Sequence, residues 1–271
     1  MSHKITKRGI FRTSPIMLFS EIVYGPIHSR RLGRSLGMEL MPLEHKLCTF
    51  DCVYCECGFN QPVSHPVLPT REEVYEALKE KLDTLQKAGE GIDVITFSGN
   101  GEPTLHPDFL GIIRDTCALR DKYFPSAKVS VLSNSTQLER ADVVEALRLC
   151  DNRILKLDSA IDSTMQAIDQ PLNKDLTVRK IIDMLSTFNG DFTLQTCFLR
   201  GVHDGVAIDN TTPEEVAAWY NAVNELKPRQ IMMYVIDRAT PVKTLEKVPR
   251  AELEHIAAPL QTNGYDIIIS A

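Results

Sequence analysis

The sequence predicts an α/β fold in which parallel strands alternate with helices. Short β-branched and apolar runs typical of buried strands recur along the chain, and segments with apolar residues at helical spacing lie between them. No Gly/Ser linker and no internal repeat divides the 271 residues. Repeated strand–helix units imply parallel strands joined by right-handed crossovers. The fold is therefore a (β/α) barrel, complete or partial, or an open doubly wound sheet.

The expected elements follow one another without long gaps. Strands are expected at residues 35–40, 93–97, 128–132, 153–157, 192–199, 230–236 and 265–270. Helices are expected at residues 70–85, 107–120, 139–149, 175–188 and 249–262, with a further helix opening at 212. Thr70 with Glu73 forms a capping-box pattern, and Thr212 precedes Pro213 as N-cap and first-turn residue. In such folds, functional groups lie at the C-terminal ends of the strands.

Composition is that of a soluble globular protein, with 43% hydrophobic and 24% charged residues. No apolar run approaches the roughly 20 residues that span a bilayer, and the N-terminus lacks a signal-peptide core, so we expect a cytoplasmic protein without membrane association. Residues 1–34 carry seven basic residues against one acidic residue, although the whole chain is −6. We therefore divide the chain into a basic N-terminal segment, 1–34, and a single core domain, 35–271. The acidic core argues against broad nucleic-acid coating, while the basic segment is either a solvated terminus or a contact for a phosphate-bearing substrate.

Four of the seven cysteines lie within ten residues, as Cys48, Cys52, Cys55 and Cys57. One tight cluster in a long chain points to metal binding and not to a disulfide scaffold. Three thiolates spaced CxxxCxxC can hold three irons of a cubane and leave the fourth iron open. The alternatives are a zinc-stabilised binding module, with Cys57 as fourth thiolate, and an iron–sulfur electron-transfer protein.

Two polar motifs follow expected strands. Ser98-Gly99-Asn100-Gly101-Glu102-Pro103 comes after the strand 93–97, where glycines allow close backbone approach and a carboxylate can pair with an ammonium group. The same residues would also make an ordinary turn. Ser133-Asn134-Ser135-Thr136 ends the next strand, and it either contacts a ligand or caps the following helix.

Lys156 and Asp158 lie two residues apart on an expected strand, so both point to the same face. A buried lysine and aspartate need partners. They form either a salt bridge in the barrel interior or a contact with cofactor or substrate. Asp237-Arg238, at the end of the strand 230–236, is either a ligand contact or a surface pair, and Cys197 is expected in the core.

The cysteine motif carries a family resemblance. CxxxCxΦC with an aromatic Φ, here Tyr54, resembles the signature of the radical SAM superfamily. The stretch 24–37 and Cys55-Glu56-Cys57-Gly58 are similar to an Fe–S oxidoreductase branch related to wyosine-type tRNA-modifying enzymes, over residues 22–240. The second cysteine set of those enzymes has no match here, so their tRNA activity is not carried over.

The resemblance implies a partial (β/α)6 TIM-like barrel that holds a 4Fe–4S cluster on Cys48, Cys52 and Cys55. In this family the cluster cleaves S-adenosylmethionine reductively to a 5′-deoxyadenosyl radical, which abstracts hydrogen from a substrate. Cys57 belongs to the branch pattern and need not bind iron. The implied electron donor is a flavodoxin or ferredoxin, in an oxygen-poor environment. The substrate is unidentified, and a large one such as a peptide or RNA is a hypothesis.

The resemblance also assigns residues to the cofactor. The residues expected to bind it are Tyr54, Gly99, Asn100, Gly101, Glu102, Ser133, Asn134 and Lys156. Lys156 and Asp158 are the candidate catalytic residues.

Overall fold

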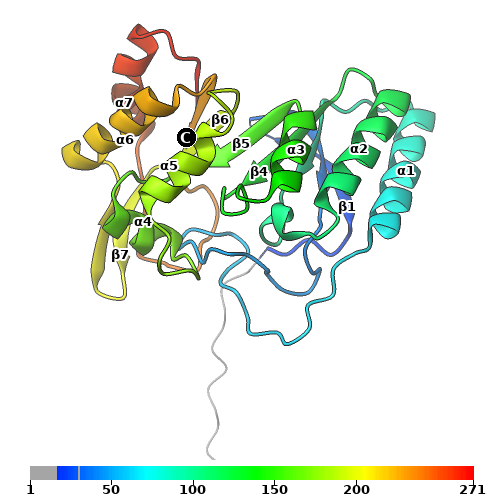
Figure 1. The fold of residues 1–271 in the computed structure, drawn as a ribbon, viewed down its shortest axis with the longest axis horizontal. Coiled ribbons are helices and arrows are strands. Elements are labelled where there is room, and N and C mark those ends of the chain that lie inside the picture. Colours follow the sequence, from blue (N-terminus) through cyan, green and yellow to red (C-terminus); the bar gives the residue numbers. More distant parts are fainter. Residues whose placement is uncertain (1–16, 30) are drawn as a thin grey trace, which may run out of the picture.

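The structure is a computed structural model that describes residues 17–29 and 31–271. Its main sheet has eight strands in the order β1-β2-β3-β4-β5-β6-β9-β11 (Figure 1). Within this sheet, neighbouring strands pair in parallel from β2 through β3, β4, β5, β6 and β9 to β11. β1 pairs antiparallel with β2 at the edge. β1 and β11 lie at opposite edges and do not pair, so the described strands form an open, curled half-barrel. The expected α/β partial barrel is confirmed.

The elements have the following bounds. The strands are β1 (Val23–Ser29), β2 (Gly33–Met38), β3 (Val94–Phe97), β4 (Lys128–Ser133), β5 (Asn152–Lys156), β6 (Thr193–Cys197), β7 (Leu199–His203), β8 (Val206–Asp209), β9 (Gln230–Tyr234), β10 (Glu246–Lys247) and β11 (Ile267–Ser270). The helices are α1 (Arg71–Lys87), a 3₁₀ turn (Pro103–Leu105), α2 (Phe109–Tyr123), α3 (Ala141–Leu149), α4 (Asp162–Asp169), α5 (Val178–Ser186), α6 (Pro213–Leu226) and α7 (Arg250–Thr262).

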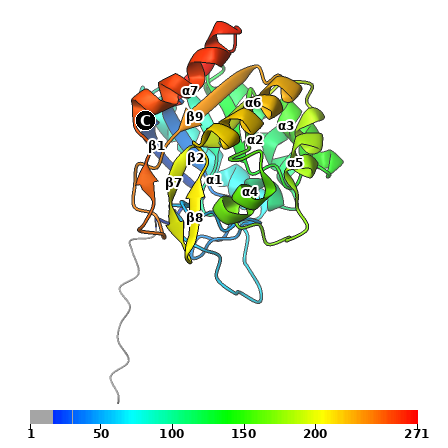
Figure 2. The same ribbon diagram turned by 90° about the vertical axis from the view of Figure 1, so that its left-hand side faces the viewer.

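Helix starts follow the local chemistry expected from the sequence. The Thr70 side chain accepts a hydrogen bond from the backbone N–H of Glu73, and the Glu73 carboxylate accepts one from the backbone N–H of Thr70. These two bonds form the capping box of α1. Thr212 caps α6 ahead of Pro213. Figures 1 and 2 show the helices along the outer side of the curled sheet. No helix in the described part of the chain is long and apolar enough to cross a membrane.

Two parts of the fold were not expected. Helix α4 has only eight residues, too few to show a clear apolar period. Strands β7, β8 and β10 form a small separate antiparallel sheet, which lies next to α4 in Figure 2. Their exposed side chains, including Val202 and Val206, hide the alternation of a half-buried strand.

The N-terminal hairpin joins the core sheet. β1 pairs with β2, so the boundary expected at residue 34 falls inside this hairpin. Lys4, Lys7, Arg8, Arg12 and Arg30 lie outside the described residues.

The parallel strands place their last residues at one edge of the sheet. Those residues are Met38, Phe97, Ser133, Lys156, Cys197 and Tyr234. The polar motifs predicted from the sequence follow or include these positions, so the topology gathers them at one mouth of the half-barrel.

Candidate active site

The cysteine loop follows β2 and crosses the C-terminal edge of the sheet. Leu47 pairs with the Gly-Asn-Gly turn, because its N–H donates to Asn100 O (2.9 Å) and its carbonyl accepts from Glu102 N (3.1 Å). The buried Lys46 donates to Asp51 Oδ1 (3.2 Å) and to the carbonyl of Gly58 (3.0 Å), which ties the two ends of the loop together. These bonds hold the loop against the turn at Gly99–Glu102.

The thiols of Cys48, Cys52 and Cys55 surround Lys46 electrostatically. Burial alone would lower the pKa of Lys46, but these three sulfurs and Asp51 raise it above its ordinary value. Burial raises the pKa of Cys48 to about 12 and that of Cys52 well above its usual range. All three thiols therefore act on one buried ammonium group.

Cys57 bonds within the loop and to the neighbouring turn. Its interaction with Cys55 is the main cause that lowers the pKa of Cys55 to about 6. The same sulfur lies 3.2 Å from the carbonyl oxygen of Gly99. Cys57 thus connects the cysteine loop with the Gly-Asn-Gly turn.

The turn at Gly99–Glu102 has little room for side chains. A Cβ on Gly101 would lie 1.8 Å from the carbonyl oxygen of Leu47, so only glycine allows this backbone approach. The Asn100 side chain accepts from Phe19 N (2.8 Å) and donates to the carbonyls of Phe19 (2.9 Å) and Pro42 (3.0 Å). Asn100 therefore holds the segment that precedes β1 through its side-chain amide.

The buried carboxylate of Glu39 contacts this turn, and it was not predicted from the sequence as a site residue. It accepts from Asn100 N (2.6 Å) and Met41 N (2.7 Å). Burial raises the pKa of Glu39 to about 8, although these backbone bonds oppose the shift. Nothing in the local sequence pattern distinguishes Glu39 from a surface residue at a strand end.

Glu102 is a buried carboxylate without a cationic partner among the described residues. Its oxygens accept from Asn134 N (2.7 Å), Thr104 N (3.1 Å) and Thr104 Oγ1 (2.5 Å). Burial raises the pKa of Glu102, and its charge contributes to the raised pKa of Cys48. A buried anion beside the cysteines suits a cationic ligand group.

The Ser133–Thr136 segment contacts the cysteine loop. Asn134 Nδ2 donates to Thr49 Oγ1 (2.8 Å) and lies 3.5 Å from Cys48 Sγ. Ser133 accepts from Ser135 N (3.1 Å). The alternative that this segment caps the following helix is wrong, because α3 begins at Ala141 after Arg140.

Lys156 and Asp158 face the barrel interior and form the salt bridge that the sequence allowed, at 3.1 Å. Asp169, the last residue of α4, adds a second carboxylate at 2.7 Å from Lys156 Nζ. Lys156 Nζ also donates to Cys52 Sγ at 2.9 Å, which joins this cluster to the cysteine loop. Burial would lower the pKa of Lys156, but the two aspartates raise it well above its ordinary value.

Two tyrosines complete this buried network. The Tyr54 hydroxyl donates to Asp158, and the Tyr234 hydroxyl donates to Tyr54 at 3.2 Å. The Lys156 ammonium lies 4.9 Å from the centre of the Tyr54 ring. Neither Asp169 nor Tyr234 was predicted as a site residue. Helix α4 was not expected, and the strand that carries Tyr234 was expected to end two residues later, at 236.

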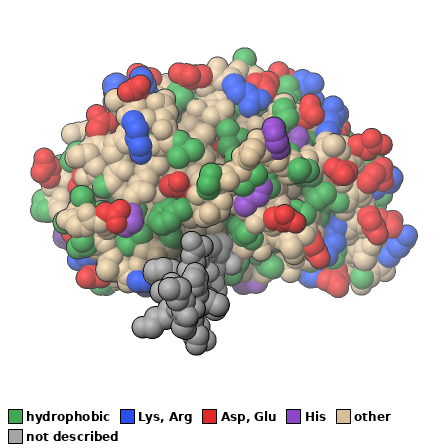
Figure 3. Space-filling view, turned by 90° about the horizontal axis from the view of Figure 1, so that it is seen from below, with side chains coloured by type: hydrophobic (Ala, Val, Ile, Leu, Met, Phe, Trp, Pro, Cys, Tyr) green, Lys and Arg blue, Asp and Glu red, His purple; other side chains and the backbone are tan. Residues whose placement is uncertain are grey.

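Other polar positions serve structural contacts. Arg238 pairs with Glu56 of the cysteine loop at 2.7 Å, and Asp237 lies 3.3 Å from Lys247 Nζ. Cys197 is fully buried, as expected, and its N–H donates to Asp158 at 2.8 Å. Figure 3 shows the molecule from the side of the loops, where acidic, basic and hydrophobic side chains are interspersed over the visible face.

Comparison with known proteins decides the family. A family model described as the Radical SAM superfamily matches residues 45–204, more than half of the chain. The chain belongs to the radical SAM superfamily. This superfamily uses a 4Fe–4S cluster and S-adenosylmethionine, so the chain is a radical SAM enzyme with these cofactors. The family and cofactors expected from the cysteine motif are confirmed.

Curated relatives extend over most of this chain. A UPF0026 protein of Synechocystis is 30% identical over 88% of this chain and 82% of its own length, which places the chain among the UPF0026 proteins. A Brachyspira hyodysenteriae protein named GTPase Obg is 29% identical over 89% of this chain. The chain spans only 34% of that relative's length.

A solved radical SAM methyltransferase from Sphaerobacter thermophilus has the same fold. Its TM-score is 0.60 at 12% identity, over 87% of this chain and 66% of that one. At this identity the likeness supports the half-barrel fold alone.

Proposed function

We propose that this enzyme cleaves S-adenosylmethionine reductively and uses the resulting 5′-deoxyadenosyl radical to abstract hydrogen from a substrate. The observation that carries the proposal is the buried Glu102 carboxylate, which lies beside Cys48 without a cation among the described residues. S-Adenosylmethionine carries an ammonium group that would neutralise it. A protein that only transferred electrons would need no anion here.

The cysteines fit a cluster better than a single ion. In the described part of the chain, no three His, Cys, Asp or Glu side chains are arranged to hold one metal ion. A structural zinc site requires four ligands around one atom. A cubane instead spreads its thiolates over different irons, so its ligands need not converge on one point. The arrangement therefore favours a cluster on Cys48, Cys52 and Cys55 over the zinc-stabilised module.

The chain's own side chains would take distinct roles. The three thiolates hold the cluster, whose chemistry is to supply the single electron that splits the sulfonium. Glu102 orients the ammonium of the bound S-adenosylmethionine. The backbone N–H of Asn134 donates to the Glu102 carboxylate and so holds Asn134 next to Glu102. Ser133 shares this strand end and offers a hydroxyl.

The interior pair has a positioning role in this proposal. Lys156 hydrogen-bonds Cys52 Sγ and is itself held by Asp158 and Asp169. It fixes the Cys52 thiolate on the barrel side of the loop. Tyr54 is anchored by its bond to Asp158, which turns its ring toward the lysine.

The proposal includes a one-electron donor, for which a flavodoxin or ferredoxin is the expected class. The rival iron–sulfur electron-transfer function differs in one respect, because it needs no S-adenosylmethionine. Binding of that cofactor therefore separates the two.

Glu102→Gln tests the proposal. We expect it to weaken S-adenosylmethionine binding to the reconstituted protein by about tenfold or more, because a hydrogen bond between charged groups is lost. Glu76→Gln makes the same charge change on the exposed side of α1 and should bind like wild type. Equilibrium dialysis measures both. Undetectable binding to the wild-type holoprotein would favour the electron-transfer function.

A further inference from the structure

Hydroxyl and amide side chains line the barrel interior toward the N-terminal ends of the strands. Ser35 Oγ lies 2.8 Å from Thr96 Oγ1 on the next strand, and Asn152 donates to Ser130 Oγ at 2.9 Å. Thr193 Oγ1 also donates to Gln230 Oε1 at 3.4 Å, and Gln195 Nε2 lies 3.4 Å from Met232 Sδ. Barrel interiors that are packed as a core are dominated by Val, Ile and Leu. Buried polar groups are costly unless they are hydrogen-bonded, and these side chains bond one another, so the interior offers a preformed polar surface to an occupant.

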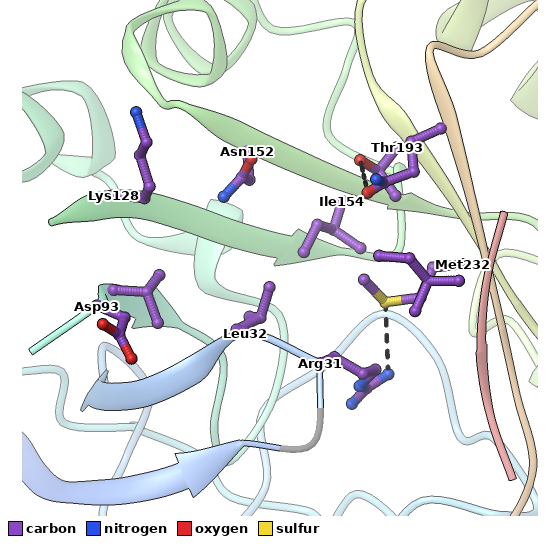
Figure 4. Close-up of a pocket in the computed structure, with 11 residues that line it drawn as sticks. Arg31, Leu32, Asp93, Lys128, Asn152, Ile154, Thr193 and Met232 are labelled. Atoms are coloured by element: carbon purple, nitrogen blue, oxygen red, sulfur yellow. Dashed lines mark hydrogen bonds between the residues drawn. The ribbon is translucent and has the colours of Figure 1, made fainter. Parts of the chain in front are cut away.

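A cavity of about 250 Å³ lies among the N-terminal ends of these strands (Figure 4). Asn152, Thr193 and Gln230, each the first residue of its strand, line it together with Ile154 and Met232. The Arg31 side chain enters it from the turn between β1 and β2 and points toward Met232. The cavity has room for a small molecule or for one end of a larger one.

The Arg31 guanidinium has no carboxylate within ion-pair distance among the described residues. Its contacts are Met232 Sδ, 3.8 Å from Nη1, and the Tyr234 ring, whose centre lies 4.9 Å away. The other two charged residues of the cavity are already engaged. Asp93 accepts from Arg34 N at 2.7 Å, and Lys128 lies 3.5 Å from Asp151. Arg31 therefore has its planar set of N–H donors available to an anion in the cavity.

Arg31 is also close to the mouth where the cofactors bind. The Tyr234 ring that it contacts carries the hydroxyl bonded to Tyr54, the aromatic residue of the cysteine motif. Along β5, Asn152 in the cavity and Lys156 at the mouth are four residues apart, about 13 Å at the usual rise of a strand. A molecule whose anionic end meets Arg31 could thus present its other end to the mouth.

We propose that Arg31 binds the carboxylate or phosphate of a small polar substrate, whose hydroxyl or amide groups meet the polar interior of the barrel. This inference rests on the proposed function, because it names the substrate class of that same site. A carboxylate and a phosphate both accept two parallel N–H bonds from a guanidinium. The cavity is large enough to hold such a small acid whole.

Isothermal titration calorimetry on the reconstituted protein with S-adenosylmethionine, without reductant, tests this inference. Succinate and inorganic phosphate are titrated separately, which distinguishes a carboxylate from a phosphate site. We expect one of them to bind saturably, and Arg31→Gln to weaken it by about tenfold to a hundredfold. Arg34→Gln is the matched control, since it removes the same charge from the same hairpin at an exposed pair with Glu90, and it should bind like wild type.

Arg31→Lys provides a second variant, which keeps the charge but loses the planar fork, and it should bind with intermediate affinity. Equal affinity in wild type and Arg31→Gln, or no saturable binding of either anion to wild type, would overturn the inference. The proposed function is judged separately, by production of 5′-deoxyadenosine in the wild-type protein. If that product forms but Arg31→Gln binds the anion as tightly as wild type does, this inference alone fails. If no product forms, the proposed function fails whatever the anion affinity.

Discussion

Replacing Lys156 with methionine should strongly destabilise the protein. The Lys156 ammonium is buried and lies 3.1 Å from Asp158 and 2.7 Å from Asp169, both of which are also buried. Methionine has similar length but no charge, so it leaves two buried carboxylates without a cation. Removing one partner of a buried ion pair costs about 3–5 kcal/mol. For a chain of this size, that corresponds to a fall in melting temperature of about 10 °C.

Urea unfolding of the apoprotein, followed by circular dichroism, measures this loss. Lys79→Met is the matched control, because Lys79 pairs with Glu76 on the exposed side of α1, and it should leave the unfolding midpoint unchanged. The double variant Lys156→Met/Asp169→Asn should regain part of the lost free energy, since one uncompensated carboxylate is removed. A single variant as stable as wild type, or a double variant no more stable than the single one, would show that Lys156 does not compensate the charge of the buried carboxylates.

The pH dependence of this variant gives a second check. Burial raises the pKa of Asp169 to about 7, against the opposing effect of Lys156. Its pKa in the unfolded chain is about 3.9, so the folded state binds the proton more tightly and stability falls as pH rises between these values. Without the ammonium, the pKa of Asp169 rises further. The deficit of Lys156→Met should therefore be smaller at about pH 5 than at about pH 8.

Two further predictions concern the Gly-Asn-Gly turn. Asn100→Ala removes three hydrogen bonds, two to Phe19 and one to Pro42, and should lower the free energy of unfolding by about 1–3 kcal/mol, as measured by urea unfolding. An unchanged midpoint would show that these bonds do not hold the segment before β1. Burial raises the pKa of Glu39 to about 8, well above its unfolded value, so the wild-type melting temperature should fall as pH rises from about 5 to 8. A melting temperature that rises over this range would contradict that shift.

Short-range patterns predicted much of the site. The spacing of Cys48, Cys52 and Cys55 lies within one loop, and its chemistry needs no knowledge of the rest of the chain. The period of two expected for an extended segment placed Lys156, the last residue of β5, and Asp158 on one face, and the structure shows them paired. The rule that functional groups lie at the C-terminal ends of parallel strands placed Glu102 and Asn134 at the same mouth, where they are bonded.

Contacts between distant segments could not be predicted in this way. Asp169 reaches Lys156 only because the short helix α4 returns over the cysteine loop, where Val53 N donates to the carbonyl of Ile168. The Asn100 side chain is bonded to Phe19, 81 residues away in sequence, and no local pattern predicted that contact. Arg31 was counted as part of a basic segment, and only the pairing of β1 with β2 turns it toward the barrel interior.

The most direct test of the central claim is 5′-deoxyadenosine production by the anaerobically reconstituted protein with dithionite and S-adenosylmethionine, followed by mass spectrometry. We expect wild type to make this product, and we expect Cys48→Ala, Cys52→Ala and Cys55→Ala not to make it. Cys57→Ala should still make it, because the Cys57 thiol donates to the carbonyl of Gly99 and is not assigned to iron. A well-formed cluster that yields no 5′-deoxyadenosine in the wild-type protein would contradict the account.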